Sequence, residues 1–497
     1  MTGSITARQW LTLLTVQFTT VLFGLTSTSV TVILPQLKGA LSASPDQASW
    51  ILTFNLVATA VATPLTGWLA GKLGWRRLML LSVSGFTLAS VLCGTVDSLE
   101  AMLALRVLQG ALGAPIFPMG QTILLAGFPR SQHPFIIMMW GVGGVMGPIL
   151  GPTFGGLITD LLSWRWMFFL ILPLGAVAAT AVAASLTDNE KGTQPRFDYT
   201  GYVFISITIA ATQLMLDRGQ RNDWFDSPET IAECVLALLF LQMFVIHMVT
   251  SPAPIFRAAT FADRNFAVGV IMALVMGMQQ YGPMLLFPPL LQELRGYPER
   301  IIGFLIATRG LGNFLSFFIV AQFTRYNARL CLCTGLAIQA FAAVWMGSLD
   351  INMTTRDVLW TNMLHGFGFG LSYTPMAILA FSTLPGHLLT QGNAIFSLLR
   401  MIGSSLFISV ILLVFTYSTA EASAHLSSLL SIFRLDAINP WIAIYGVASE
   451  AGPYDRVAAE VLRQSSMIGY LNAFHLMTIL PLIAAPLAFL FAARRRD

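Results

Sequence analysis

Charged residues are scarce in this sequence. Asp, Glu, Lys and Arg together make up 10% of its 497 residues, and hydrophobic residues make up 56%. An ordinary soluble domain carries about a quarter charged residues. So few charges cannot cover a water-facing surface, which excludes an ordinary soluble protein. The composition instead predicts an all-α chain that crosses a membrane many times.

Cysteine and histidine are also rare, with four and six copies. The four cysteines lie in apolar segments, and Cys331 and Cys333 have the wrong spacing for a zinc or thioredoxin motif. A membrane enzyme would need clustered acidic residues, a His/Asp pair or a set of metal ligands, and the sequence shows none of these. We therefore expect no metal, no cofactor and no enzymatic activity.

The basic residues give no support for nucleic-acid binding. The net charge is only +4, and clusters such as Arg494–Arg496 lie at the ends of apolar segments. Nucleic-acid binding would call for a basic patch with interleaved aromatic residues. The bilayer is the expected partner of such a chain.

Apolar segments long enough to cross a bilayer, about 20 residues each, recur about fourteen times. The predicted spans are 11–36, 48–70, 77–96, 99–126, 134–158, 165–186, 199–217, 230–250, 266–292, 300–323, 329–349, 357–384, 391–417 and 468–493. Lysine and arginine collect in alternate loops, on the side that also receives Arg8 and the Arg494–Arg496 tail. Because cytoplasmic loops are enriched in these residues, both termini are predicted to be cytoplasmic.

The longest predicted loop, 416–466, lies on the outer side. It carries Trp441, Tyr445 and Tyr454, and its segment Glu450–Arg463 has the spacing of a short amphipathic helix. Loops beyond about 15 residues are uncommon unless they have a function. We interpret this loop as a docking surface for a periplasmic partner, with a solvated connector as the alternative.

The span 134–158 is rich in glycine and proline. Small residues let two helices approach closely in lipid, as a transporter needs at the interface between domains that move against each other. Ordinary packing in a membrane bundle is the alternative. The order G-P-x-x-G-P-x-x-G-G resembles the antiporter signature of proton-driven drug exporters in the major facilitator superfamily. Its residues are Gly147, Pro148, Gly151, Pro152, Gly155 and Gly156.

The segment between the second and third spans resembles the loop signature of that superfamily, G-x-L-x-D-R-x-G-R-R. Its residues are Gly67, Gly71, Lys72, Gly74, Arg76 and Arg77. Glycines permit a tight turn between helices, and basic side chains can pair with helix C-termini. Gly71 stands where the signature has its acid, which removes the carboxylate of the usual conformational latch. The segment also marks the cytoplasmic side.

Arg106 lies within the fourth span. A charge at membrane depth costs at least a few kcal/mol and must face a polar partner or a cavity. The pattern Arg106-Val-Leu-Gln109-Gly resembles the fourth-helix motif of the superfamily, whose arginine is linked to proton coupling. A structural ion pair is the alternative.

Further motifs resemble the EmrB/QacA branch, the fourteen-helix drug:proton antiporters. They include Trp164-Arg-Trp-Met-Phe168, Gly366-Phe-Gly-Phe-Gly370 and Arg400-Met-Ile-Gly-Ser-Ser405. The resemblance covers nearly the whole chain. It implies a major facilitator fold with two six-helix halves, 1–190 and 256–497, and two accessory helices within 191–255.

One departure from this branch concerns proton coupling. Its first helix reads L-D-x-T-x-x-N-x-x-L-P, whereas this chain has Thr26 at the acidic position and Thr31 at the amide. Hydroxyl groups can bind a ligand but cannot titrate near neutral pH. His365 titrates in the right range and is a candidate coupling group, with a packing role as the alternative. Arg400 joins the candidates for the central cavity.

The resemblance implies an exporter of amphipathic or hydrophobic compounds, driven by the proton gradient, in a bacterial inner membrane. It also implies a periplasmic adaptor protein and an outer-membrane channel as partners. The alternatives are an exporter of one metabolite, such as a siderophore or fatty acid, a proton-uncoupled facilitator, and a non-transporting interaction protein.

Overall fold

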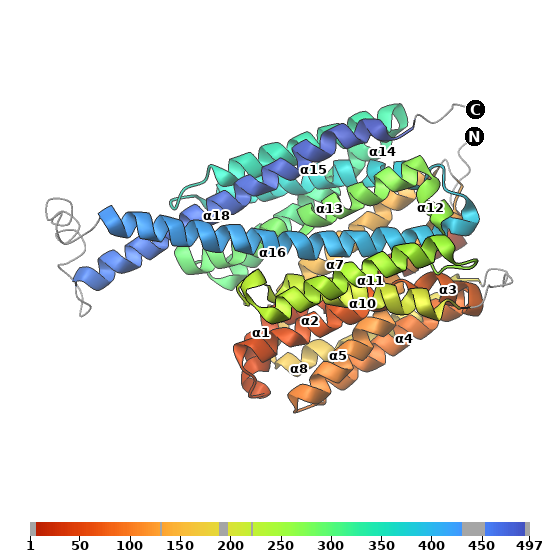
Figure 1. Cartoon of the computed structure of the whole chain (residues 1–497), viewed down its shortest axis with the longest axis horizontal. Helices are drawn as coiled ribbons and strands as arrows, with labels where there is room; N and C mark the ends of the chain where they lie inside the picture. The colour runs from red at the N-terminus through yellow and green to blue at the C-terminus, as the bar shows by residue number, and fades with distance from the viewer. Residues whose placement is uncertain (1–5, 130–131, 188–196, 220–221, 430–452, 493–497) are drawn as a thin grey trace.

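The computed structural model describes residues 6–129, 132–187, 197–219, 222–429 and 453–492, and the regular elements of these ranges are helices (Figure 1). Hydrocarbon offers no hydrogen-bond partners, so a spanning segment satisfies its backbone internally as a helix. The expected all-α fold is confirmed. The first half contains α1 (Ala7–Ala40), α2 (Pro45–Ala62), α3 (Leu65–Leu73), α4 (Trp75–Cys93), α5 (Leu99–Gly113), α6 (Ile116–Gly127), α7 (His133–Leu161), α8 (Trp164–Phe169) and α9 (Ile171–Ser185).

Proline residues mark the breaks within two spans of the first half. α2 and α3 meet at Pro64 with a bend of 58°, and α5 and α6 meet at Pro115. Proline lacks an amide hydrogen, and its ring clashes with the preceding turn. Each of these predicted spans is therefore built from two shorter helices.

Two accessory helices, α10 (Tyr199–Arg218) and α11 (Pro228–Thr250), follow, joined through the short turn η2 (Trp224–Asp226). The Asp198 carboxylate caps α10 by accepting a hydrogen bond from the Gly201 amide. It also lies 2.8 Å from His247 Nε2 and accepts a hydrogen bond from the Ile255 amide at 3.0 Å. One carboxylate thus ties the accessory pair to the chain that leads into the second half.

In the second half, one element, α14 (Glu299–Gly347), contains two of the predicted spans, 300–323 and 329–349. α14 runs through both, but Asn327 has non-helical backbone angles, and its Oδ1 accepts hydrogen bonds from the amides of Arg329 and Leu330. This is the capping pattern of a new helix start. The elements of this half are α12 (Ala258–Ala262), α13 (Arg264–Pro289), η3 (Leu290–Leu294), α14 (Glu299–Gly347), α15 (Thr355–Phe381), η4 (Gly386–Leu388), α16 (Leu389–Leu429), α18 (Pro453–Leu487) and η5 (Ala488–Leu490).

The spans agree with the expected architecture. By length and composition, 11 helices of the described residues could cross a membrane, and 12 if α2 and α3 form one bent span. α7 and α15 are long helices outside that set. Together they match the predicted total of about fourteen and confirm the fold class.

The segment predicted as the loop 416–466 differs from the expectation. α16 continues to Leu429 and α18 begins at Pro453, so both ends of the predicted loop 416–466 are helix. Figure 1 shows these two helices projecting together beyond the rest of the bundle. α16 and α18 are in contact where these extensions begin, because the Phe415 and Tyr470 rings lie 4.5 Å apart. Trp441 and Tyr445 lie outside the described residues, and of Tyr454 the structure describes only its place in α18.

The two halves meet along α6, α7, α14, α15 and α16. Near the end of the bundle that carries Lys72, the buried Asn393 of α16 donates a hydrogen bond to Thr122 Oγ1 of α6 at 3.0 Å. α10 lies beside this seam (Figure 1). It contacts both halves, because the Tyr202 hydroxyl donates to the Val61 carbonyl of α2 and Ser409 of α16 donates to the Leu216 carbonyl of α10.

Candidate functional site

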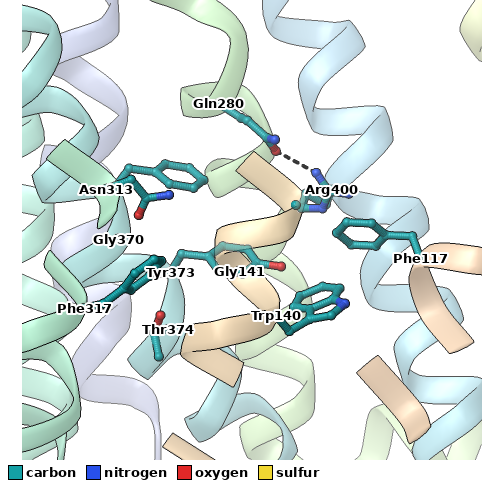
Figure 2. Close-up of a pocket in the computed structure, with 12 residues that line it drawn as sticks. Phe117, Trp140, Gly141, Gln280, Asn313, Phe317, Gly370, Tyr373, Thr374 and Arg400 are labelled. Carbon is teal, nitrogen blue, oxygen red and sulfur yellow. Dashed lines mark hydrogen bonds between the residues drawn. The ribbon is translucent and has the colours of Figure 1, made fainter. Parts of the chain in front are cut away.

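A cavity lies between the two halves, in the middle of the bundle (Figure 2). It contains about 360 Å³ of space free of atoms, some of it open to the outside. Aromatic rings form much of its wall, and a second hollow beside it shares Gln280, Asn313 and Phe369. The first hollow is lined by Phe117, Trp140, Gly141, Gly144, Gln280, Asn313, Phe317, Phe369, Gly370, Tyr373, Thr374 and Arg400.

Arg400 brings a positive charge to this cavity. Its guanidinium lies 4.6 Å from the centre of the Phe117 ring of the first half. One nitrogen donates a hydrogen bond to Gln280 Oε1 at 2.6 Å, as Figure 2 shows, whereas the buried Nε has no partner among the described residues. The structure thus places Arg400 in the wall of the cavity, and its role there stays a prediction.

A second buried arginine, Arg309 of α14, lines the neighbouring hollow. Its guanidinium donates hydrogen bonds to the backbone carbonyls of Gln280 and Gln279, the latter at 3.2 Å. Gln280 therefore contacts both arginines, Arg400 through its side chain and Arg309 through its backbone. His365 is fully buried next to Gln279, and its Nε2 lies 3.4 Å from Gln279 Oε1.

Glycines allow this close packing in the second half. A methyl group on Gly366 would overlap the Arg309 backbone carbonyl, and one on Gly277 would overlap the Arg400 carbonyl. The helices that carry the two arginines thus lie against glycine faces of α15 and α13.

Arg106 lies inside the first half and lines neither hollow. It is 1% exposed, its guanidinium donates to Gln109 Oε1, and the Phe168 ring lies 5.2 Å away. Gln109 in turn donates to Ser90 Oγ at 2.6 Å. No described carboxylate pairs with this arginine. Its polar partners are neutral, so the alternative of an ion pair finds no support among the described side chains.

The hydroxyl row of α1 does not point into the cavity. Thr26 is 2% exposed and donates its hydroxyl hydrogen to the Leu22 carbonyl of its own helix at 2.8 Å. Thr31 donates in the same way to the Thr28 carbonyl at 2.7 Å. These side chains satisfy their donors locally, and neither belongs to the lining of the two hollows.

The glycine signature of α7 packs against α1. A methyl group on Gly147 would lie 2.7 Å from the Val21 carbonyl oxygen, and one on Gly151 would lie 2.7 Å from that of Leu25. Gly155 faces Ser29 in the same way, while Gly156 has room for a methyl group. Pro148 lines the second hollow, whereas the Pro152 side chain lies outside the described residues. α7 therefore joins α1 tightly on one face and borders the cavity on another.

The loop signature forms a tight turn, and one of its basic residues contacts a helix end. Gly74 has a φ of +86°, a conformation that favours glycine, at the turn between α3 and α4. Arg76 donates a hydrogen bond to the Ala183 carbonyl, in the last turn of α9, at 2.7 Å. Lys72 lies over the Trp68 ring, and Gly67 faces Gln391 of α16. This end of α3 therefore contacts the second half directly.

Of the five residues predicted for coupling or the cavity, Arg400 alone lines the first hollow. Arg309 and Gln280 were not among the residues predicted for coupling or the cavity. Arg309 sits in an apolar span, as Arg106 does, so the cost of a charge at membrane depth was a usable signal. The Gln279–Gln280 pair within α13 is a weaker signal of the same kind.

The family model described as Major Facilitator Superfamily matches residues 16–408. The fatty acid resistance protein FarB of Neisseria gonorrhoeae is 32% identical over 389 residues, 78% of this chain and 77% of that protein. The multidrug export protein EmrB of Haemophilus influenzae is 32% identical over 405 residues, 81% and 79% of the two chains. EmrB of Escherichia coli K12 is 29% identical over 416 residues, 83% and 81% of the two chains.

Solved structures agree on the fold. The proton:xylose symporter XylE has a TM-score of 0.64 at 12% identity, and the match covers 97% of this chain and 96% of that one. The human organic anion transporter MFSD10 has a TM-score of 0.60 at 13% identity, covering 96% and 99%. The chain therefore belongs to the major facilitator superfamily, in the group that contains EmrB and FarB.

Proposed function

We propose that this chain is a multidrug exporter that moves amphipathic compounds through the cavity between its two halves. One observation carries the proposal: both halves contribute side chains to one aromatic cavity in the middle of the bundle. A site between two halves that rock against each other can open to either side of a membrane in turn. The similarity to EmrB, named as a multidrug export protein, supports the same function.

The proton gradient is the proposed energy source. A proton carrier must change its protonation state during the cycle, and imidazole titrates nearest to neutral pH. His365 is fully buried beside Gln279 and its Nδ1 has no described partner, so it is our candidate. Arg106 is proposed to act in the same coupling from within the first half.

The proposed location is a bacterial inner membrane with both termini in the cytoplasm. The end of the bundle that carries Lys72 and Arg76 would then face the cytoplasm, in accordance with the distribution of basic residues. The Thr122–Asn393 hydrogen bond joins the halves near that end. The projecting ends of α16 and α18 would lie in the periplasm.

Transport in proteoliposomes tests the function. Purified protein is reconstituted with a fluorescent amphipathic dye inside the vesicle and a pH gradient across the membrane. We expect dye efflux that requires the gradient, together with proton movement that requires the dye. Efflux without proton movement would instead support a facilitator, and no efflux of any compound would contradict the exporter.

A periplasmic adaptor and an outer-membrane channel are the proposed partners. A permease alone would release an amphipathic compound into the periplasm, from which the compound can re-enter the inner membrane. The helical extensions of α16 and α18, which project together beyond the bundle (Figure 1), offer a surface for an adaptor.

Deleting residues 422–460, which removes the helical extensions of α16 and α18 with the segment between them, should separate transport from resistance when the shortened helices are joined through a short Gly/Ser linker. We expect efflux from proteoliposomes to stay at the wild-type rate, because every residue that lines the cavity is retained. Drug resistance of cells that contain the adaptor should fall to the level of cells without the transporter. Equal loss in both assays would indicate a cap over the cavity, and unchanged resistance would remove the docking role.

A further inference from the structure

The charges around the cavity do not balance. Arg400 lines the first hollow and Arg309 the second, and no acidic residue belongs to either lining. None of the ion pairs between described side chains includes either arginine. Each is less than a tenth exposed. The cavity therefore concentrates two positive charges without a described protein counter-charge.

Buried arginines normally pair with an acid, because removing a charge from water is costly. Here neutral groups replace the acid. Arg309 is held by the backbone carbonyls of Gln279 and Gln280, while Arg400 has the Gln280 side chain and the face of Phe117. These contacts fix the two guanidinium groups but do not neutralise them.

Arg400 keeps donor capacity for a ligand. Its Nε is buried without a described partner, although the guanidinium borders the cavity. A guanidinium has five N–H donors in a planar fork that fits a carboxylate through two parallel hydrogen bonds. An anionic group beside Arg400 would satisfy the free donor and supply the missing charge.

The rest of the cavity wall is largely aromatic. Trp140 faces Tyr373 with the ring centres 6.4 Å apart, and Phe369 stacks on Tyr373 at 5.6 Å. These rings belong to both halves and surround the space next to Arg400 (Figure 2). The polar and apolar parts of the wall therefore match the two ends of an amphipathic anion.

We propose that the cavity selects anionic amphipathic compounds, with a carboxylate or similar anionic head held by Arg400 and the positive field of Arg309. As a statement about the exported substrate, this inference rests on the proposed function. The binding preference can be measured without transport. Cationic amphipathic compounds are rejected, because the same two charges repel them.

Binding to the full-length protein in lipid nanodiscs tests the proposal. The probes are 11-(dansylamino)undecanoic acid and its methyl ester, which differ in the negative charge, and dodecyltrimethylammonium serves as a cationic competitor. We expect the wild-type protein to bind the acid about tenfold or more tighter than the ester, as a charge-assisted hydrogen bond implies. The cation should not displace the bound acid.

Variants locate the effect. Arg400→Gln should weaken binding of the acid about tenfold or more and leave the ester unchanged, and Arg400→Lys should restore part of the preference. Arg165→Gln is the matched control, because Arg165 forms a partly exposed pair with Asp97 outside the cavity. Equal binding of acid and ester, displacement by the cation, or an unchanged preference in Arg400→Gln would overturn the proposal. The wild-type comparison stands even if Arg400→Gln fails to fold.

Parallel efflux measurements separate this inference from the proposed function. Charge-selective binding without efflux of the acid or of any other compound would contradict the exporter and leave the binding specificity standing. Efflux of the cation by a protein that shows no preference for the acid would contradict the specificity and leave the exporter standing.

Discussion

Replacing Arg106 with alanine should reduce efflux from proteoliposomes to the rate of protein-free vesicles, while the protein still inserts and folds. The structure surrounds this arginine with Gln109, the Phe168 ring and other neutral groups, and no described carboxylate compensates its charge. Burying such a charge costs free energy, and a group kept at that cost is expected to serve function. Efflux of the dansylated acid measures the loss.

The melting temperature of Arg106→Ala distinguishes a role in coupling from a structural role. Because alanine removes a buried charge and breaks no described ion pair, the melting temperature should stay the same or rise. Arg106→Lys keeps the charge but not the planar fork, so we expect partial efflux. Wild-type efflux by a folded Arg106→Ala protein would eliminate the coupling role. A large drop in melting temperature would show instead that the arginine is structural.

Replacing Gly151 with leucine should abolish efflux through a different mechanism. Even a methyl group at Gly151 would lie 2.7 Å from the Leu25 carbonyl oxygen and 2.9 Å from the Ser29 amide nitrogen. These atoms are backbone and cannot move aside alone, so α1 and α7 must separate. Overpacked sites typically lower the free energy of unfolding by about 1 to 3 kcal/mol, and we expect at least this loss here. It would be measured as a lower melting temperature together with lost efflux.

Gly156→Ala is the matched control within the same motif. The added methyl group would meet only Val32 Cγ1, at an ordinary contact distance of 3.8 Å. We expect efflux and melting temperature close to wild type. If Gly151→Leu transported normally, the tight α1–α7 contact would not be needed for the cycle, whereas loss of efflux in Gly156→Ala would point to a role beyond packing.

The extent of α16 was not predictable from hydropathy. The predicted span 391–417 ends where the apolar residues end, but α16 continues to Leu429. Hydropathy detects the part of a helix that lies in hydrocarbon, whereas a helix satisfies its backbone equally well in water. The continuation, residues 418–429, has three alanines and two leucines and no glycine or proline, so nothing in it ends a helix.

The sequence alone determined the class of the protein, the number of spans and the face of α7 that packs closely. Each of these follows from local composition: an apolar run of sufficient length must become a helix in lipid, and glycines permit a close neighbour wherever they recur on one face.

Only the tertiary structure decided which buried arginine reaches the cavity. Arg106, Arg309 and Arg400 all lie within apolar spans, so the cost of burial marks them alike. Their roles separate because Arg106 is enclosed by its own half, whereas Arg309 and Arg400 face the space between the halves. The rotation of each helix about its axis sets this difference, and contacts between helices far apart in the sequence fix that rotation.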